Sequence, residues 1–221
     1  MRAAQFCTSC GKVQPPKPVD YFSFFGLPRK LNVDVGALER EFYVLSRKLH
    51  PDLYIQDQER EQAWSLEQSS LLNDAYRTLK DPIRRTEYLL RLEGVELEEQ
   101  SKAATEKARA SGEIKKQVVP PDLLEEVFEL NMQLEELRMQ KKLGEDDPAL
   151  TEEVGKQKLA LEAKNEALLD ELKSYWNEWD QVEAVASEEE RLRVRDKIVD
   201  LLNRRNYIRN LVRTVEEVLE C

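Results

Sequence analysis

The sequence predicts an all-α protein with two helical regions. Gly residues are few, seven in 221, while charged residues make up 35% of the chain, and Glu, Leu, Lys, Arg and Ala dominate. Such a composition favours helices. In both halves, apolar residues also recur at spacings of three and four, and capping residues and prolines separate these periodic segments. A chain of this length holds one or two domains.

The charge and hydropathy patterns exclude several classes of function. The net charge is −10 and the pI is about 4.9, so we expect no nucleic-acid partner. Apolar runs are only a few residues long, and we therefore expect no membrane-spanning segment. The first residues, MRAAQFCTSCGK, do not resemble a secretory signal, and we expect a cytoplasmic location.

Composition along the chain divides it into four regions. Residues 1–19 hold a pair of cysteines and then three prolines, which predict an extended spacer. Residues 20–93 form a compact helical domain. Residues 94–121 contain very few large apolar side chains and predict a linker. Residues 122–221 contain three helical segments.

The first helical domain has clear boundaries. An apolar face at Leu38, Phe42, Leu45 and Leu49 predicts a helix that begins at Asp34, a capping residue, and ends by His50. Pro51 sets that end because proline disfavours a helical conformation in the residue before it. A second helix carries Leu66, Leu72, Ala75, Tyr76 and Leu79, and Asp81-Pro82 starts a short third helix that Gly94 closes.

The C-terminal region predicts a three-helix bundle. Asp122 and Glu125 resemble a capping box before an apolar face that runs from Leu123 to Leu137. Asp147-Pro148 starts the next helix, and Ser187 with Glu190 starts the last. Short connections make these helices antiparallel neighbours. We expect Trp176 and Trp179 to pack this bundle rather than bind a cofactor.

The tripeptide His50-Pro51-Asp52 stands where the first long helix ends, and it contains the only histidine of the chain. Together with Asp20-Tyr21-Phe22, the stretch from Leu72 to Pro82, Arg85 and Tyr88, it resembles the J-domain family. That resemblance implies docking on a DnaK-type chaperone and stimulation of its ATPase through the tripeptide and a basic helix face, here Arg40, Arg47 and Lys48. No nucleophile or acid–base pair accompanies His50, so we expect no enzyme.

Three features resemble the HscB (Jac-type) co-chaperones in particular: Tyr21 to Pro28, the segment Arg84 to Leu90, and the acidic three-helix bundle. The resemblance implies delivery of an IscU-type iron–sulfur scaffold to an HscA-like chaperone. When the family pattern is aligned on Glu129-Leu130-Asn131, the resemblance places scaffold-binding residues at Leu123, Leu124, Phe128 and Tyr207. Glu125 departs from the pattern because that position is usually apolar in the family. Leu124 and Phe128 lie off the core face and are expected to be exposed.

Cys7 and Cys10, followed by Gly11, resemble half of a zinc knuckle. Some HscB relatives carry two such pairs, and this sequence matches the second of them. A structural zinc needs four ligands, so Cys221 or a second chain would have to complete the site. A redox role and a knuckle that binds no metal stay open.

Two alternatives exist for the whole chain. One is a J-domain adaptor for another client, and the other is a structural coiled coil. Gly144, Pro148 and Ser187 disfavour the coiled coil because they interrupt the heptads.

Overall fold

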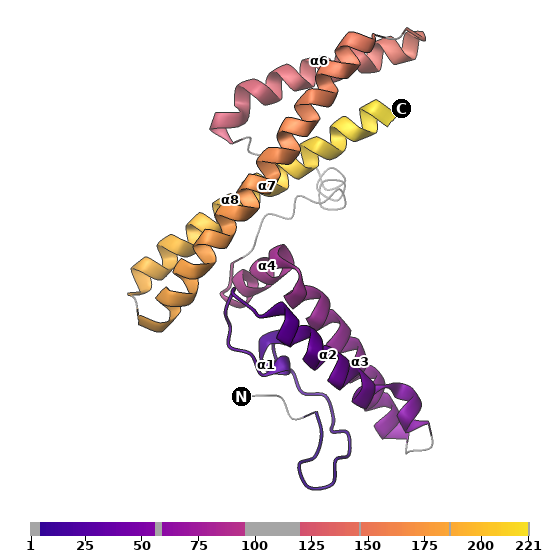
Figure 1. Ribbon diagram of the computed structural model, residues 1–221, viewed down its shortest axis with the longest axis vertical. Helices are drawn as coiled ribbons and strands as arrows, with labels where there is room; N and C mark the ends of the chain where they lie inside the picture. Colours follow the sequence, from indigo (N-terminus) through magenta and orange to yellow (C-terminus); the bar gives the residue numbers. More distant parts are fainter. Residues whose placement is uncertain (1–4, 56–58, 96–119, 146, 186, 221) are drawn as a thin grey trace, which may run out of the picture. The chain divides into compact units, whose positions relative to one another are not determined.

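The computed structural model describes residues 5–55, 59–95, 120–145, 147–185 and 187–220 (Figure 1). Over these ranges its regular elements are all helices, apart from one isolated β-bridge between Phe6 and Val13. The predicted fold class is confirmed. The chain packs as two compact units. Unit 1 comprises Met1–Glu96 and Trp176–Ser187, and unit 2 comprises Leu97–Tyr175 and Glu188–Cys221.

Unit 1 contains four α-helices and one short 3₁₀ helix in its first segment. These are α1 (Tyr21–Phe25), α2 (Val35–Leu49), η1 (Pro51–Tyr54), α3 (Glu59–Lys80) and α4 (Pro82–Leu92). Aspartates cap three of the α-helices: Asp20 accepts the Ser23 N–H, Asp34 the Ala37 N–H, and Asp81 the N–H groups of Ile83 and Arg84. The predicted starts of α2 and α4 are therefore confirmed, since each carboxylate satisfies N–H groups that lack a partner within the helix.

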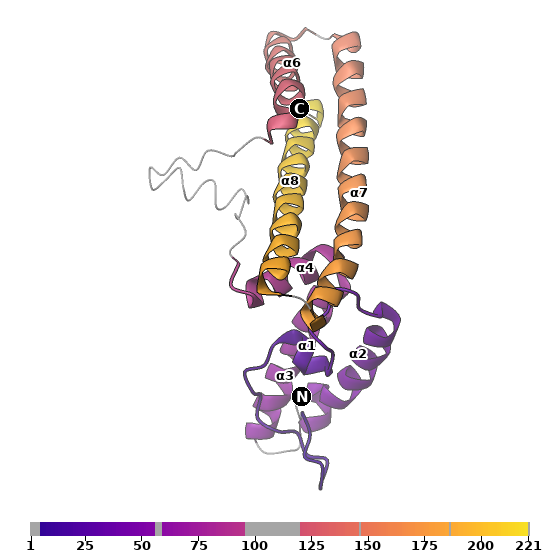
Figure 2. The same ribbon diagram turned by 90° about the vertical axis from the view of Figure 1, so that its left-hand side faces the viewer.

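Helices α2 and α3 run side by side and share the core of unit 1 (Figures 1 and 2). Their buried apolar residues are Leu38, Leu45, Leu49, Leu72, Ala75 and Leu79. Phe42 stacks on Tyr76 with ring centroids 4.1 Å apart. Leu66, predicted to lie on this face, is instead 63% exposed, and Ser65 and Gln68 occupy the inward positions. The prediction was wrong because both inward polar groups find backbone partners, which the apolar pattern alone does not reveal.

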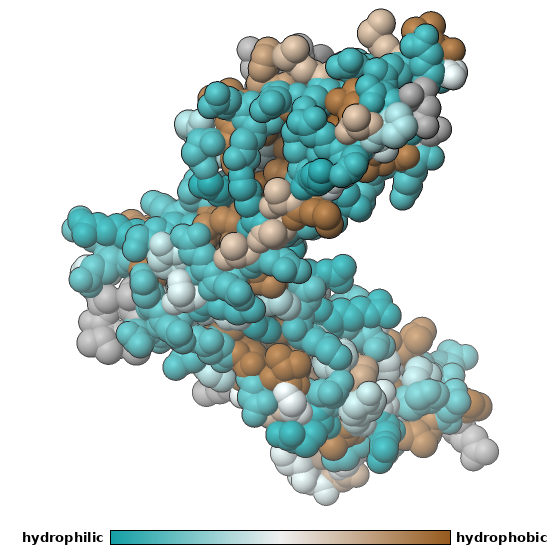
Figure 3. Space-filling view, turned by 45° about the horizontal axis from the view of Figure 1, so that its top comes forward, coloured by the Kyte–Doolittle hydropathy of each residue, from teal (hydrophilic) through white to brown (hydrophobic). Residues whose placement is uncertain are grey.

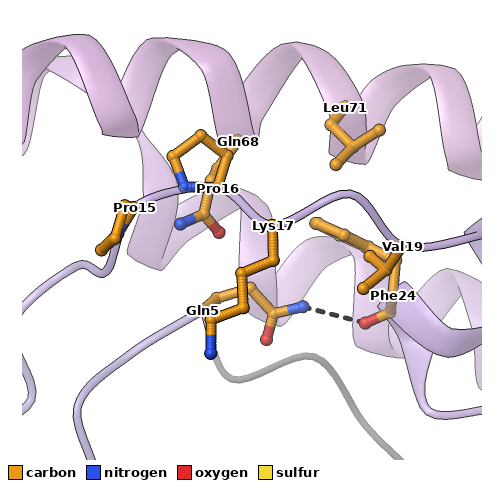
Figure 4. Close-up of a pocket in the computed structure, with 8 residues that line it drawn as sticks. All are labelled: Gln5, Pro15, Pro16, Lys17, Val19, Phe24, Gln68 and Leu71. Atoms are coloured by element: carbon orange, nitrogen blue, oxygen red, sulfur yellow. Dashed lines mark hydrogen bonds between the residues drawn. The ribbon is translucent and has the colours of Figure 1, made fainter.

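The N-terminal extension folds against unit 1. Residues 5–14 form a small hairpin in which Cys7 N–H donates to Lys12 O (2.8 Å) and Gln14 N–H donates to Gln5 O (2.9 Å). The side chain of Gln5 donates to Phe24 O, and Gln68 of α3 donates to Gln14 O. Figure 4 shows Pro15, Pro16 and Val19 close to α3. The extension is thus packed onto the helices that follow it.

The last part of α7 (Pro148–Val185) also belongs to unit 1. Asp180 accepts the N–H groups of Leu31 and Asn32, at 2.8 and 2.9 Å. Trp176 and Trp179 are buried in this unit, at 6% and 1% exposure. Both tryptophans are buried, as predicted, but Trp176 packs against Arg85 of α4, outside the predicted bundle. Helical periodicity identifies a buried face without saying what covers it.

Unit 2 contains α6 (Leu124–Leu143), α7 up to Tyr175, and α8 (Glu188–Glu220), preceded by η2 (Pro121–Leu123). The three predicted helices are confirmed. Their buried faces carry Val127, Leu130, Leu134, Leu137, Leu161, Leu168, Leu172, Val194, Ile198, Leu201, Leu202, Ile208, Leu211, Val215 and Val218. Among the described residues, no helix is both long and apolar enough to cross a membrane.

The predicted capping box before α6 is not formed. The N-cap of α6 is Leu123, which makes no side-chain capping bond, because a turn of 3₁₀ helix precedes the α-helix. Asp122 pairs with Arg204 of α8 instead. A tertiary ion pair has thus replaced the local contact expected from the sequence. The predicted linker, residues 94–121, lies almost entirely outside the described residues.

Candidate functional site

The connection between α2 and α3 presents His50, Pro51 and Asp52 to solvent. His50 caps the C-terminus of α2 in an extended conformation (φ −60°, ψ 126°), and Pro51 opens η1. The His50 Nδ1 accepts the Asp52 N–H at 3.3 Å and lies 3.6 Å from Asp52 Oδ2. The two side chains are 56% and 76% exposed, so both can meet a partner surface.

Hydrogen bonds from α3 hold the base of this loop. The carbonyl of Leu49 accepts from Ser65 Oγ at 2.8 Å and from Ser69 Oγ at 2.6 Å. The Tyr54 hydroxyl donates to the Lys48 carbonyl at 2.8 Å. These bonds satisfy carbonyls that have no partner at the end of a helix. The tripeptide therefore directly follows Leu49, the last residue of α2, which is hydrogen-bonded to α3.

The outer face of α2 carries the predicted basic residues. Arg40, Arg47 and Lys48 are all exposed on it. Tyr43 and Val44 lie on the same face and are 56% and 46% exposed. With a turn of about 100° per residue, Arg40 and Arg47 project roughly opposite the buried Leu38. Val44 projects between Arg40 and Lys48, and Tyr43 lies on the other side of Arg47. The face thus places apolar side chains beside cations.

The sequence prediction omitted the apolar residues of this face. The sequence did indicate that Tyr43 and Val44 are exposed, because neither lies on the helix face that Leu38, Phe42 and Leu45 form. Leu53 and Ile55, at 62% and 68% exposure, add apolar surface just after the tripeptide. Exposed apolar groups beside cations are typical of protein-binding surfaces.

The four residues that the family resemblance assigned to scaffold binding fall into two groups. Leu124 and Phe128 of α6 are exposed, at 55% and 68%. Leu123 and Tyr207 are only 3% and 6% exposed, and burial raises the pKa of the Tyr207 hydroxyl. The structure therefore places Leu124 and Phe128 at the surface of unit 2 and Leu123 and Tyr207 in its interior.

The cysteine pair lies at the turn of the N-terminal hairpin. Gly11, with φ +71°, donates its N–H to Cys7 O at 2.9 Å, which closes the turn. Hydrogen bonds from the backbone N–H groups of Cys10 and Ser9 lower the pKa of the Cys7 thiol. This turn favours a Cys7 thiolate, the form that binds a soft metal such as zinc.

The described residues offer only part of a zinc site. Among them, no group of three or more His, Cys, Asp or Glu side chains is placed so that it could hold a metal ion. Cys7 and Cys10 would supply two of the four ligands of a structural zinc, and Cys221 lies outside the described residues. The residues present fit half of a tetrahedral site.

Comparisons with solved structures extend over most of the chain. The crystal structure of human co-chaperone protein HscB matches with a TM-score of 0.65 and 25% identity, over 98% of this chain and 91% of that one. Chaperone HscB from Vibrio cholerae matches with a TM-score of 0.57 and 25% identity, over 90% of this chain and 97% of that one. The fold of the chain is thus similar to that of two HscB co-chaperones over most of its length.

Curated HscB proteins match a shorter part of the chain. The iron–sulfur cluster co-chaperone protein HscB of Mus musculus is 43% identical over 95 residues, which are 42% of this chain and 41% of the mouse protein. The Arabidopsis thaliana homolog is 34% identical over 132 residues, 59% of this chain and 46% of that protein. In these alignments the chain spans less than half the length of its HscB relatives. No protein-family model matches the sequence.

Proposed function

We propose that this HscB-type chain is a co-chaperone that stimulates the ATPase of a DnaK-type, HscA-like chaperone. The observation that carries the proposal is the exposed His50-Pro51-Asp52 loop, held to α3 through Leu49 and continuous with the cationic outer face of α2. In this proposal residues 20–93 form the J-domain, and the tripeptide with Arg40, Arg47 and Lys48 contacts the chaperone.

The electrostatics of the chain support an acidic docking site on the chaperone. The whole chain carries −10, yet the outer face of α2 gathers three cations. Local positive charge on an acidic protein steers encounter with an acidic surface and disfavours other orientations. Tyr43 and Val44 supply apolar area beside these cations, from which a partner surface would exclude water.

We further propose that the bundle, residues 122–221, binds an IscU-type iron–sulfur scaffold and delivers it to the chaperone. The names of the HscB relatives and the exposed Leu124 and Phe128 support this part. The chain would act by binding and would make no covalent bonds, because His50 and Asp52 lie in open solvent rather than in a water-excluded cleft. The cytoplasmic location stays a prediction.

The test is ATP hydrolysis by the DnaK-type chaperones of the host, measured with the wild-type chain, with His50→Gln and with Arg213→Glu. Arg213 is an exposed cation on α8 and is not among the residues of the proposed contact. We expect stimulation by wild type and Arg213→Glu and loss of stimulation in His50→Gln. Absence of stimulation by the wild-type chain with every chaperone would overturn the proposal.

Addition of the scaffold separates the two parts of the proposal. A further rise in ATPase rate with an IscU-type scaffold supports delivery of that client. Stimulation that the scaffold leaves unchanged would favour the alternative, a J-domain adaptor for another client protein.

A further inference from the structure

Helix α6 is apolar on two opposite faces. Its inner face, with Val127, Leu130, Leu134 and Leu137, is buried in unit 2. Large apolar residues also recur on the outside at positions 124, 128, 132, 139 and 143. Each residue turns the helix by about 100°, so Phe128, Met132, Met139 and Leu143 lie within about 60° of one another around the helix axis. Their mean direction is about 170° from that of the inner face. A helix that only covered a core would be polar there.

The outer face is exposed along its whole length. Met132, Met139 and Leu143 are 61%, 65% and 70% exposed, and continue the surface that begins at Leu124 and Phe128. Nineteen residues of helix separate Leu124 from Leu143, which at about 1.5 Å per residue is about 28 Å. A shallow hollow there is lined by these apolar residues from Phe128 onward and by the polar Asn131, Glu135, Glu136 and Gln140. Elsewhere, hydrophobic side chains form scattered patches on the mainly hydrophilic surface of Figure 3.

Acidic residues border one edge of this apolar strip. Glu125, Glu129 and Glu136 are all exposed and lie about 100° to 140° from Leu124 around the helix axis. An occupant that brings basic side chains to this edge gains complementary charge, whereas an acidic one is repelled. A second copy of the chain packed antiparallel would set two such acidic edges against each other, so the charges disfavour that mode of self-association.

We propose that the outer face of α6, from Leu124 to Leu143, binds an amphipathic helix of the client, with basic side chains along the edge that faces Glu129 and Glu136. A straight apolar strip about 28 Å long with spacings of four and seven residues fits a helix packed alongside it. The inference rests on the proposed function and extends it, because Met139 and Leu143 lie three to five turns beyond the Leu124–Phe128 patch.

The experiment measures binding of the full-length chain to an IscU-type scaffold by calorimetry. The tested variant is Met139→Ser/Leu143→Ser, at the far end of the strip. Leu159→Ser is the matched control, since Leu159 is 65% exposed on α7. We expect the double variant to weaken binding about tenfold or more and the control to match wild type. Circular dichroism melts check that both variants stay folded.

A second pair of variants separates failure of this inference from failure of the proposed function. If Leu124→Ala/Phe128→Ala weakens binding while Met139→Ser/Leu143→Ser equals wild type, the inference is overturned and the proposed client stands. If the wild-type chain does not bind the scaffold, the proposed client itself fails. A wild-type dimer that Met139→Ser/Leu143→Ser dissociates in sedimentation would overturn the inference in favour of self-association.

A third double variant tests the acidic edge. Glu129→Lys/Glu136→Lys should weaken scaffold binding at low salt and approach wild type at high salt, because screening removes the repulsion. Unchanged or tighter binding at low salt would contradict the basic edge of the client.

Discussion

The guanidinium of Arg85 lies over the indole ring of Trp176, with its Cζ 5.0 Å from the ring centroid. Arg85 is 3% exposed and also donates to Leu79 O at 2.6 Å. Burial lowers the pKa of this guanidinium, while the Asp81 and Asp180 carboxylates oppose that shift. The indole face therefore covers a cation that little water reaches, and this cation–π contact joins α4 to the end of α7 within unit 1.

Replacing Trp176 should destabilise unit 1. We expect Trp176→Ala to lower the free energy of unfolding by about 3–5 kcal/mol, since it leaves a cavity and uncovers Arg85. Trp176→Phe should lose less because an aromatic face remains. Urea denaturation followed by far-UV circular dichroism measures both, with Leu159→Ala as the control. A loss below about 1 kcal/mol for Trp176→Ala would contradict the packing described for this residue.

The two serines that bond the Leu49 carbonyl should control the order of the His50 loop. Each single change, Ser65→Ala or Ser69→Ala, should cost about 1 kcal/mol, and the double variant more, because the carbonyl then has neither partner. Hydrogen exchange at residues 52–54 should become faster in the double variant. Ser70→Ala, at an exposed position of α3, is the control. Equal exchange in the double variant and the control would show that the loop is ordered by other contacts.

Chaperone binding should have a salt-dependent and a salt-independent part. Arg40→Glu/Arg47→Glu should weaken binding more than tenfold at low salt and less at high salt, because counterions screen exposed charges. Val44→Ala should weaken binding by a similar factor at every salt concentration, since its contribution is apolar. A titration of affinity against salt for wild type and these variants tests both statements. A salt-independent wild-type affinity would contradict electrostatic docking.

Cys7 should react as a thiolate at lower pH than an unfolded cysteine. Hydrogen bonds from the backbone N–H groups of Cys10 and Ser9 lower the pKa of Cys7 in the folded hairpin. The stabilisation from this shift is present at pH above the unfolded pKa and is lost as the pH falls through the folded pKa. The variant Cys10→Ala/Cys221→Ala keeps the backbone N–H of residue 10 and leaves Cys7 as its one thiol. The pH midpoint of its alkylation rate should be higher in urea than in buffer. The same midpoint in both conditions would rule out a folded knuckle turn.

Local features of this fold were predictable from the sequence because neighbouring residues determine them. Asp34 and Asp81 start their helices by accepting N–H groups two or three residues ahead, and Pro51 ends α2 at His50. The exposure of Leu124 and Phe128 followed from their angle around the helix axis, which depends only on their distance from the core positions.

Features that depend on which elements meet were not predictable. Asp122 pairs with Arg204 rather than capping its own helix, and Ser65 rather than Leu66 faces α2, because partners distant in sequence satisfy the polar groups. The resemblance assigned Tyr207 to a binding surface, yet the structure buries it.

By itself, the sequence determined the helices, their ends, and the position of His50-Pro51-Asp52 just after α2, since these depend on contacts within a few residues. Only the tertiary structure decided that Trp176 packs against Arg85 of α4, that the Leu49 carbonyl is held by α3, and that α6 presents a second, exposed apolar face. The physical reason is that periodicity identifies which side of a helix is apolar, whereas burial depends on whether another element covers that side.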